Sequence, residues 1–145
     1  MARYRKVDPV IWHDTKFRGL HKDSQLLFLY LLTSPHSTAW GIYVIDNLYI
    51  QADTGLSQKQ ISDGVSELLA SRLILRCDKN RLVAFPNWFK FNRPENEKSI
   101  MACINGILSL PQCPVLFEFC SKSDWVSEQL ANRCLSVSEK LGSEQ

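Results

Sequence analysis

The sequence lacks most of the patterns that mark an enzyme, a metalloprotein or a membrane protein. Its 145 residues contain no glycine-rich phosphate loop, no nucleophile motif of a hydrolase and no cysteine–histidine cluster with zinc-site spacing. The longest apolar run, Leu26 to Leu32, is far shorter than the ~18 residues of a membrane span. We therefore expect a protein that is not an enzyme, has no catalytic residues, no metal and no cofactor, and does not insert into a membrane.

Paired cysteines and a secretory leader are also missing. The number of cysteines, five, is odd, and their spacing is wide, so the sequence does not indicate a disulfide framework. We expect reduced thiols that are mostly buried. The first residues, Met-Ala-Arg-Tyr-Arg-Lys, are not followed by the apolar stretch of a signal peptide. These two features predict a cytoplasmic location. The cysteines are Cys77, Cys103, Cys113, Cys120 and Cys134.

A large excess of one charge is absent as well, because the net charge is only +2. The distribution of charge is uneven, however. Residues 1–22 hold six basic residues against two acidic ones, and residues 72–93 hold six against one, whereas residues 96–145 hold four against six. Two basic stretches of this kind indicate either nucleic-acid contact or ordinary solvated surface.

Capping residues and apolar periodicity predict the order of the elements. Asp8-Pro9 indicates a short helical turn, and Ser34-Pro35 stops a strongly apolar helix that we expect to be buried on all sides. In order, we predict a helix over 23–33, a strand over 41–45, helices over 48–53 and 58–71, strands over 73–77 and 81–85 around a polar turn, an irregular segment over 87–94, and helices over 96–108 and 115–130.

The segment from Ala52 to Ser57 has the features of a tight turn between two helices. Ala52 allows two helices to approach, Gly55 permits the bend, Leu56 fills the gap between the helices, and Ser57 caps the second helix. The segment resembles a helix-turn-helix, and the hairpin after it resembles the wing of a winged helix. We therefore predict an α+β, mostly helical fold: a winged helix-turn-helix with a small antiparallel sheet (the wing) and a C-terminal helical extension. The expected parts are 1–95, the winged helix domain with a basic N-terminal arm; 96–134, the helical extension; and 135–145, a disordered tail.

In that fold the second helix of the turn would enter the major groove of duplex DNA, with glutamine reading adenine and lysine reading guanine. The hairpin tip and the N-terminal arm would contact phosphates or the minor groove. The candidate DNA-binding residues are Gln58, Lys59, Gln60, Ser62, Asp63 and Ser66 on the helix, Lys79, Asn80 and Arg81 on the hairpin, and Arg3, Arg5 and Lys6 in the arm.

Three further strings, Ala2–Pro9, Leu26–His36 and Phe85–Asn96, together resemble phage and prophage replication-initiation proteins with an N-terminal winged helix. The resemblance implies a bacterial host cell, duplex DNA as a partner, and a role in replication initiation or associated regulation. It also implies the replicative helicase or its loader as a partner, and the helices after Asn96 suit a homodimer. An alternative function is a protein-interaction adaptor of the replication machinery that does not bind specific DNA. The aromatic stretch Trp88–Phe91 fits either an exposed partner patch or simple core packing.

Overall fold

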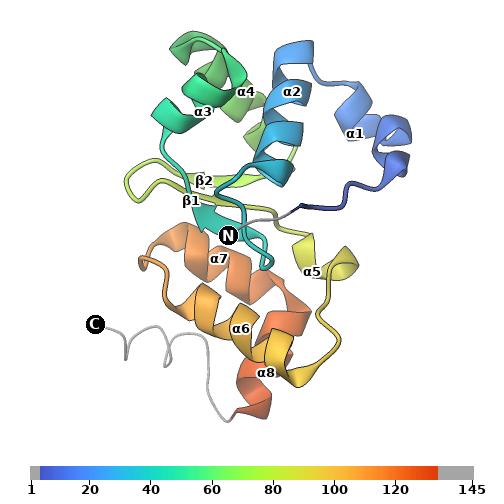
Figure 1. Ribbon diagram of the computed structural model, residues 1–145, viewed down its shortest axis with the longest axis vertical. Coiled ribbons are helices and arrows are strands. Elements are labelled where there is room, and N and C mark those ends of the chain that lie inside the picture. Colours follow the sequence, from blue (N-terminus) through green and yellow to red (C-terminus); the bar gives the residue numbers. More distant parts are fainter. Residues whose placement is uncertain (1–3, 134–145) are drawn as a thin grey trace. The chain divides into compact units, whose positions relative to one another are not determined.

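Short helices and three short strands make up the computed structural model, which describes residues 4–133. Most of these residues are helical, and the strands form one antiparallel sheet, which confirms the mostly helical α+β class. In chain order the elements of Figure 1 are the 3₁₀ turn η1 (Pro9–His13), α1 (Thr15–Arg18), α2 (Lys22–Thr33), β1 (Ile42–Val44), α3 (Asn47–Thr54), α4 (Gln58–Ala70), β2 (Leu75–Cys77), β3 (Leu82–Ala84), α5 (Trp88–Phe91), α6 (Glu97–Leu108), α7 (Pro114–Lys122) and α8 (Asp124–Asn132).

The chain divides into two compact units, each built from two stretches of sequence. The first unit is Met1–Ser37 with Ile45–Ile74, and the second is Thr38–Val44 with Leu75–Gln145. The first holds η1 and α1 to α4, and the second holds the sheet and α5 to α8. This division differs from the boundary expected after residue 95, because the three strands share a hydrophobic core with the C-terminal helices.

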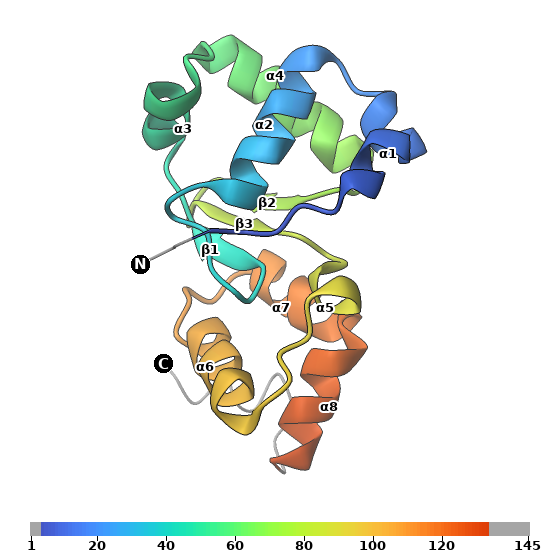
Figure 2. The same cartoon turned by 45° about the vertical axis from the view of Figure 1, so that its right-hand side comes forward.

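Helices α2 and α4 pack against each other in the first unit (Figures 1 and 2). Leu27 of α2 and Leu68 of α4 are fully buried between them. Gly64 allows the close approach, since a Cβ atom at this position would lie 2.9 Å from the Leu27 Cδ2 atom. The prediction that Ala52 lets two helices approach is wrong, because Ala52 faces solvent.

The expectation that the apolar helix α2 is buried on all sides is also wrong. Leu27, Phe28 and Leu31 are buried, but the side chain of Leu26 is 45% exposed. An unbroken apolar run has no polar face that would mark the solvent side, so periodicity could not identify this exposed edge.

The second unit is built on a sheet with strand order β1-β3-β2. Both neighbours pair antiparallel with β3, so that Ala84 lies opposite Ile42 on one side and Leu75 on the other. Every residue of β3 is buried, as expected for a central strand between two partners. The two strands of the hairpin lie within the predicted ranges and are shorter than predicted.

The C-terminal part differs from the prediction in two places. The helix expected over 115–130 is two helices, because Ser123 ends α7 and caps α8 by accepting a hydrogen bond from the Val126 amide at 3.3 Å. The segment expected to be irregular contains the short helix α5, whose Phe89 ring stacks on Trp125 with the ring centroids 4.4 Å apart. Long-range aromatic packing of this kind is not visible in local sequence.

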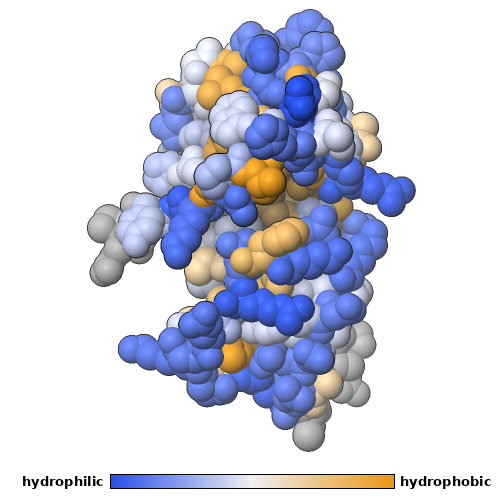
Figure 3. All heavy atoms as spheres, turned by 90° about the vertical axis from the view of Figure 1, so that its right-hand side faces the viewer, coloured by the Kyte–Doolittle hydropathy of each residue, from blue (hydrophilic) through white to orange (hydrophobic). Residues whose placement is uncertain are grey.

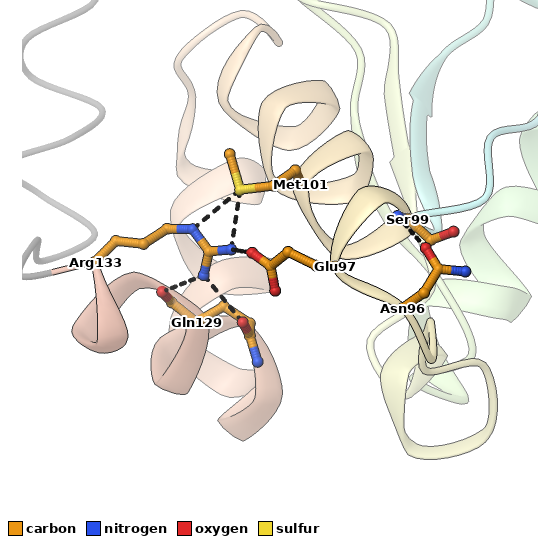
Figure 4. Close-up of polar contacts among 6 residues, drawn as sticks. All are labelled: Asn96, Glu97, Ser99, Met101, Gln129 and Arg133. Atoms are coloured by element: carbon orange, nitrogen blue, oxygen red, sulfur yellow. Dashed lines mark hydrogen bonds and ion pairs between the residues drawn. The ribbon is translucent and has the colours of Figure 1, made fainter.

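Arg133 connects α8 to α6 by contacts that the sequence did not predict (Figure 4). Its Nη2 donates to the Glu97 carboxylate at 3.0 Å, and its Nη1 donates to the Gln129 side-chain and main-chain oxygens, both at 3.0 Å. The side chain of Arg133 is 23% exposed, so this ion pair is partly shielded from water. The arrangement is structural, since it links neighbouring helices.

The described thiols are free and mostly buried, as expected. Cys103, Cys113 and Cys120 are buried and Cys77 is partly buried, while Cys134 lies outside the described residues. Burial raises the pKa of the Cys120 thiol to about 12, which keeps it protonated and unreactive. Within residues 4–133, no helix has the length and apolar character that crossing a membrane requires.

Candidate nucleic-acid interface

The predicted turn between α3 and α4 is formed by three residues whose roles are the expected ones. Gly55 ends α3 with a left-handed backbone, φ 76°, and donates its N–H to the Gln51 carbonyl at 2.9 Å. Leu56 is 5% exposed, so it fills the space behind the turn. Ser57 then caps α4: its side chain accepts from the Gln60 amide at 3.1 Å. Local chemistry therefore fixes where α4 begins.

Helix α4 has one buried and one exposed side. Ile61, Gly64 and Leu68 are buried against the first unit. Five of the six candidate residues on this helix are exposed to solvent. These residues are Gln58, Lys59, Ser62, Asp63 and Ser66.

Gln60, the sixth candidate, is exposed but already engaged. Its Oε1 accepts a hydrogen bond from the Ser57 amide at 2.8 Å, which completes a capping box. Its Nε2 donates to the Asp23 carboxylate at 3.1 Å. Gln60 therefore acts as a cap that is also joined to Asp23, and a base contact would compete with these two bonds.

The electrostatic character of the exposed side of α4 is close to neutral. The Lys59 ammonium lies 3.4 Å from the Asp63 carboxylate one turn later, and both side chains are largely exposed. An exposed pair at this spacing contributes only ~0.3–0.5 kcal/mol to the helix, so Lys59 can exchange Asp63 for a phosphate or a base edge at little cost.

His21 and Glu67 form a second polar contact between α2 and α4. The Glu67 carboxylate accepts from the His21 amide at 2.9 Å and lies 2.6 Å from the His21 Nδ1 atom. The hydrogen bond and the charge of Glu67 raise the pKa of His21. Hydrogen bonds from Ser24 and His21 lower the pKa of Glu67. No local pattern indicates this contact, since the two residues are 46 positions apart.

The hairpin residues lie together in the second unit, on the loop between β2 and β3. Lys79 and Arg81 are exposed and Asn80 is half-buried. Arg81 has a positive φ of 57°, and its carbonyl accepts from the Arg76 guanidinium at 3.1 Å, which stabilises the turn. The tip therefore presents two cations on a well-defined loop, as predicted.

The N-terminal residues differ from a free basic arm. The Arg5 guanidinium donates to the Ser37 hydroxyl at 3.0 Å and to the Ser37 carbonyl at 2.9 Å, so it is held against the loop after α2. Lys6 is exposed, and Arg3 lies outside the described residues. Of the three arm candidates, Lys6 is the one described cation that is available to a phosphate.

Metal ligands do not gather in the part of the chain that the structure describes: no three His, Cys, Asp or Glu side chains form a group suited to an ion. Comparison of the chain with protein-family models, with curated proteins and with solved structures gave no match. The chemistry available to a ligand therefore follows from α3 and α4 in the first unit and, separately, from the hairpin in the second.

Proposed function

We propose that this chain is a double-stranded DNA-binding protein of the winged helix-turn-helix type, acting in phage or prophage replication initiation or its regulation. The observation that carries the proposal is the exposed polar side of α4, a helix that follows the tight Gly55–Ser57 turn. A helix presented in this way after a short turn suits the major groove of duplex DNA.

The side chains of α4 have the chemistry to read base edges. Gln58 can form paired hydrogen bonds with adenine, Lys59 can donate to guanine, and Asp63 can accept from cytosine. Ser62 and Ser66 are short enough to let the helix approach the groove closely. The hairpin cations Lys79 and Arg81 supply phosphate contacts, which fix position and carry no sequence information.

The number of available cations sets the expected salt dependence. Lys59, Lys79, Arg81 and Lys6 are the exposed cations among the candidates. If these four each neutralise one phosphate, the slope of log K against log salt is about −3.6, from about −0.9 per phosphate. Fluorescence anisotropy with a duplex selected from a random pool, repeated over a salt series, measures this slope.

A matched pair of lysine variants tests the assignment of α4. Lys59 and Lys122 each form an exposed ion pair one helical turn away, with Asp63 at 3.4 Å and Glu118 at 3.5 Å. We expect Lys59→Ala to weaken duplex binding about tenfold and to reduce the slope by about one unit, because one phosphate or base contact is lost. Lys122→Ala should leave binding unchanged. No duplex binding at low salt, or equal effects of the two variants, would contradict the proposal.

A protein-interaction adaptor remains a second candidate function, and one observation favours it. Phe91 on α5 is 83% exposed, and Leu48 on α3 is 66% exposed, although both are large apolar side chains. Pull-down with purified replicative helicase and its loader tests this candidate. Capture that Phe91→Ser abolishes, from a protein that binds no duplex DNA, would favour the adaptor over the DNA-binding function.

A further inference from the structure

An exposed tryptophan lies on the surface turn η1, which buries none of its own residues. The Trp12 side chain is 57% exposed. One contact fixes its ring: Trp12 meets Phe17 in a T-shaped arrangement, with ring centroids 5.4 Å apart and planes at 85°. Phe17 is 1% exposed and belongs to the core of the first unit. The indole is therefore held at the surface by a buried ring that supports it.

Free cations lie next to this ring. Lys16 and Arg18 are the neighbours of Phe17 in α1, and both are exposed. Within residues 4–133, neither of them forms an ion pair. Lys22, at the start of α2, is exposed as well. Figure 3 views the molecule from the side on which Figure 1 draws α1, and it shows small apolar patches surrounded by hydrophilic residues.

The carboxylates of this segment are already used by the backbone. Asp8 accepts from the Val10 amide at 3.0 Å. Asp14 accepts from the Lys16 and Phe17 amides at 2.8 and 3.1 Å. These carboxylates compensate the partial positive charge of the two helix starts. Residues 8–23 carry three acidic and three basic side chains, and within residues 4–133 no ion pair joins Asp8 or Asp14 to Lys16 or Arg18.

We propose that the surface of η1 and α1 binds single-stranded nucleic acid: an unpaired base stacks on Trp12, and Lys16 and Arg18 hold the adjacent phosphates. Aromatic side chains beside cations are the recurring elements of such sites. A duplex cannot use the indole in this way, because its bases are already stacked on each other. A lipid anchor or an apolar protein patch would need a larger apolar area, because η1 is five residues long and exposes two large apolar side chains, Val10 and Trp12. The proposal is independent of the duplex site, because it uses other residues and another form of nucleic acid.

Tryptophan fluorescence gives a direct readout of stacking. Of the four tryptophans, Trp12 is the most exposed, and it is quenched when a base covers it. Titration of the full chain with oligo-dT and with oligo-rU at low salt should quench the emission. The ratio of the two affinities shows whether DNA or RNA is preferred, since stacking itself does not require the 2′-hydroxyl.

Variants separate stacking from charge and from duplex binding. Trp12→Ala should weaken oligonucleotide binding at least about fivefold, and Trp12→Phe should restore part of the loss because a ring remains. Tyr49→Ala serves as the control, because Tyr49 is 55% exposed on α3, a helix without basic residues in its last turn. Lys59→Ala should reduce duplex binding and leave oligo-dT binding unchanged, so the two proposals can fail separately.

Several results would overturn this inference. The first is equal affinity of the wild type and of a folded Trp12→Ala or Trp12→Phe variant for oligo-dT and oligo-rU. The second is a blue shift of the tryptophan emission with anionic vesicles when neither oligonucleotide changes the emission, which would assign the surface to lipid. The third is a loss of affinity in Tyr49→Ala equal to that in Trp12→Ala, which would show that the effect is not local to η1.

Discussion

Gly41 and Gly55 share a left-handed backbone, with φ 74° and 76°, but they differ in the space around them. A Cβ atom at Gly55 would meet nothing within 4 Å. A Cβ atom at Gly41 would lie 2.2 Å from Cγ and 2.5 Å from Cβ of Trp88. We therefore expect Gly41→Ala to be much more destabilising than Gly55→Ala, although the backbone conformations are the same.

The two costs can be estimated from the same steps. A non-glycine residue in the left-handed region costs roughly 1–2 kcal/mol. Replacing glycine by alanine regains ~0.4–1 kcal/mol, because the unfolded chain becomes less flexible. Gly55→Ala should therefore cost about 0.5–1 kcal/mol. Gly41→Ala adds an overpacking cost of ~1–3 kcal/mol, for a total of about 2–4 kcal/mol.

Trp88 cannot move aside easily, and this keeps the overpacking cost high. Its indole Nε1 donates to the Ala39 carbonyl at 2.9 Å, and its ring lies against Phe85 with the centroids 5.8 Å apart. A shift that made room for a methyl group would break this hydrogen bond and leave a donor without its acceptor.

Thermal unfolding followed by circular dichroism and tryptophan fluorescence measures both variants. At about 3 °C per kcal/mol, Gly55→Ala should lower Tm by ~2–3 °C and Gly41→Ala by ~6–12 °C. Gly55→Asn is the control, since asparagine tolerates the left-handed region and should cost less than alanine. Equal losses in Gly41→Ala and Gly55→Ala would refute the reasoning, because the contact with Trp88 would then carry no energy.

Two further predictions concern the boundaries and contacts of α4. Ser57→Ala removes the cap of the helix and should cost about 1 kcal/mol in urea unfolding, whereas Ser62→Ala on the exposed side should be neutral or slightly stabilising. His21→Gln should lose stability relative to the wild type at about pH 5.5 and not at about pH 9, at low salt. The sign follows from the two pKa shifts. Because folding raises the pKa of His21, the protonated imidazole stabilises the protein below the ordinary histidine pKa, and this stabilisation is lost as the pH rises through the folded-state pKa. Because folding lowers the pKa of Glu67, its ionised carboxylate stabilises the protein above the ordinary glutamate pKa. An effect of His21→Gln that did not vary with pH would show that the imidazolium is not the stabilising form.

The residues around the turn show how much of the site local sequence could predict. The start of α4 at Gln58, the glycine end of α3 and the buried Leu56 all follow from contacts within a few residues. Exposure of Gln58, Lys59, Ser62, Asp63 and Ser66 follows from the same helical period that buries Ile61 and Leu68. Capping hydrogen bonds and apolar periodicity involve residues that are close together in the sequence, so these features could be predicted without knowledge of the tertiary structure.

Other features required partners that are distant in sequence. The hydrogen bond from Gln60 to Asp23 joins residues that are 37 positions apart. The hydrogen bond from Arg5 to Ser37 joins residues that are 32 positions apart. Ser123 interrupts the predicted helix over 115–130, although a serine followed by Asp124 is a cap signal that could have been used. The support of Trp12 by Phe17 is close in sequence, but whether the ring is exposed depends on the rest of the first unit.

The sequence by itself determined the order of the elements from α2 to β3, the turn before α4 and the mostly helical class, because capping, glycine conformation and apolar spacing act over a single helical turn. Only the tertiary structure decided which polar side chains stay available. It engages Gln60 and Arg5, leaves Lys16 and Arg18 without an ion pair in the described chain, and places the three strands in the unit that contains the C-terminal helices. The physical reason is that burial and hydrogen-bond partners are properties of residues brought together from distant positions, and no local pattern encodes them.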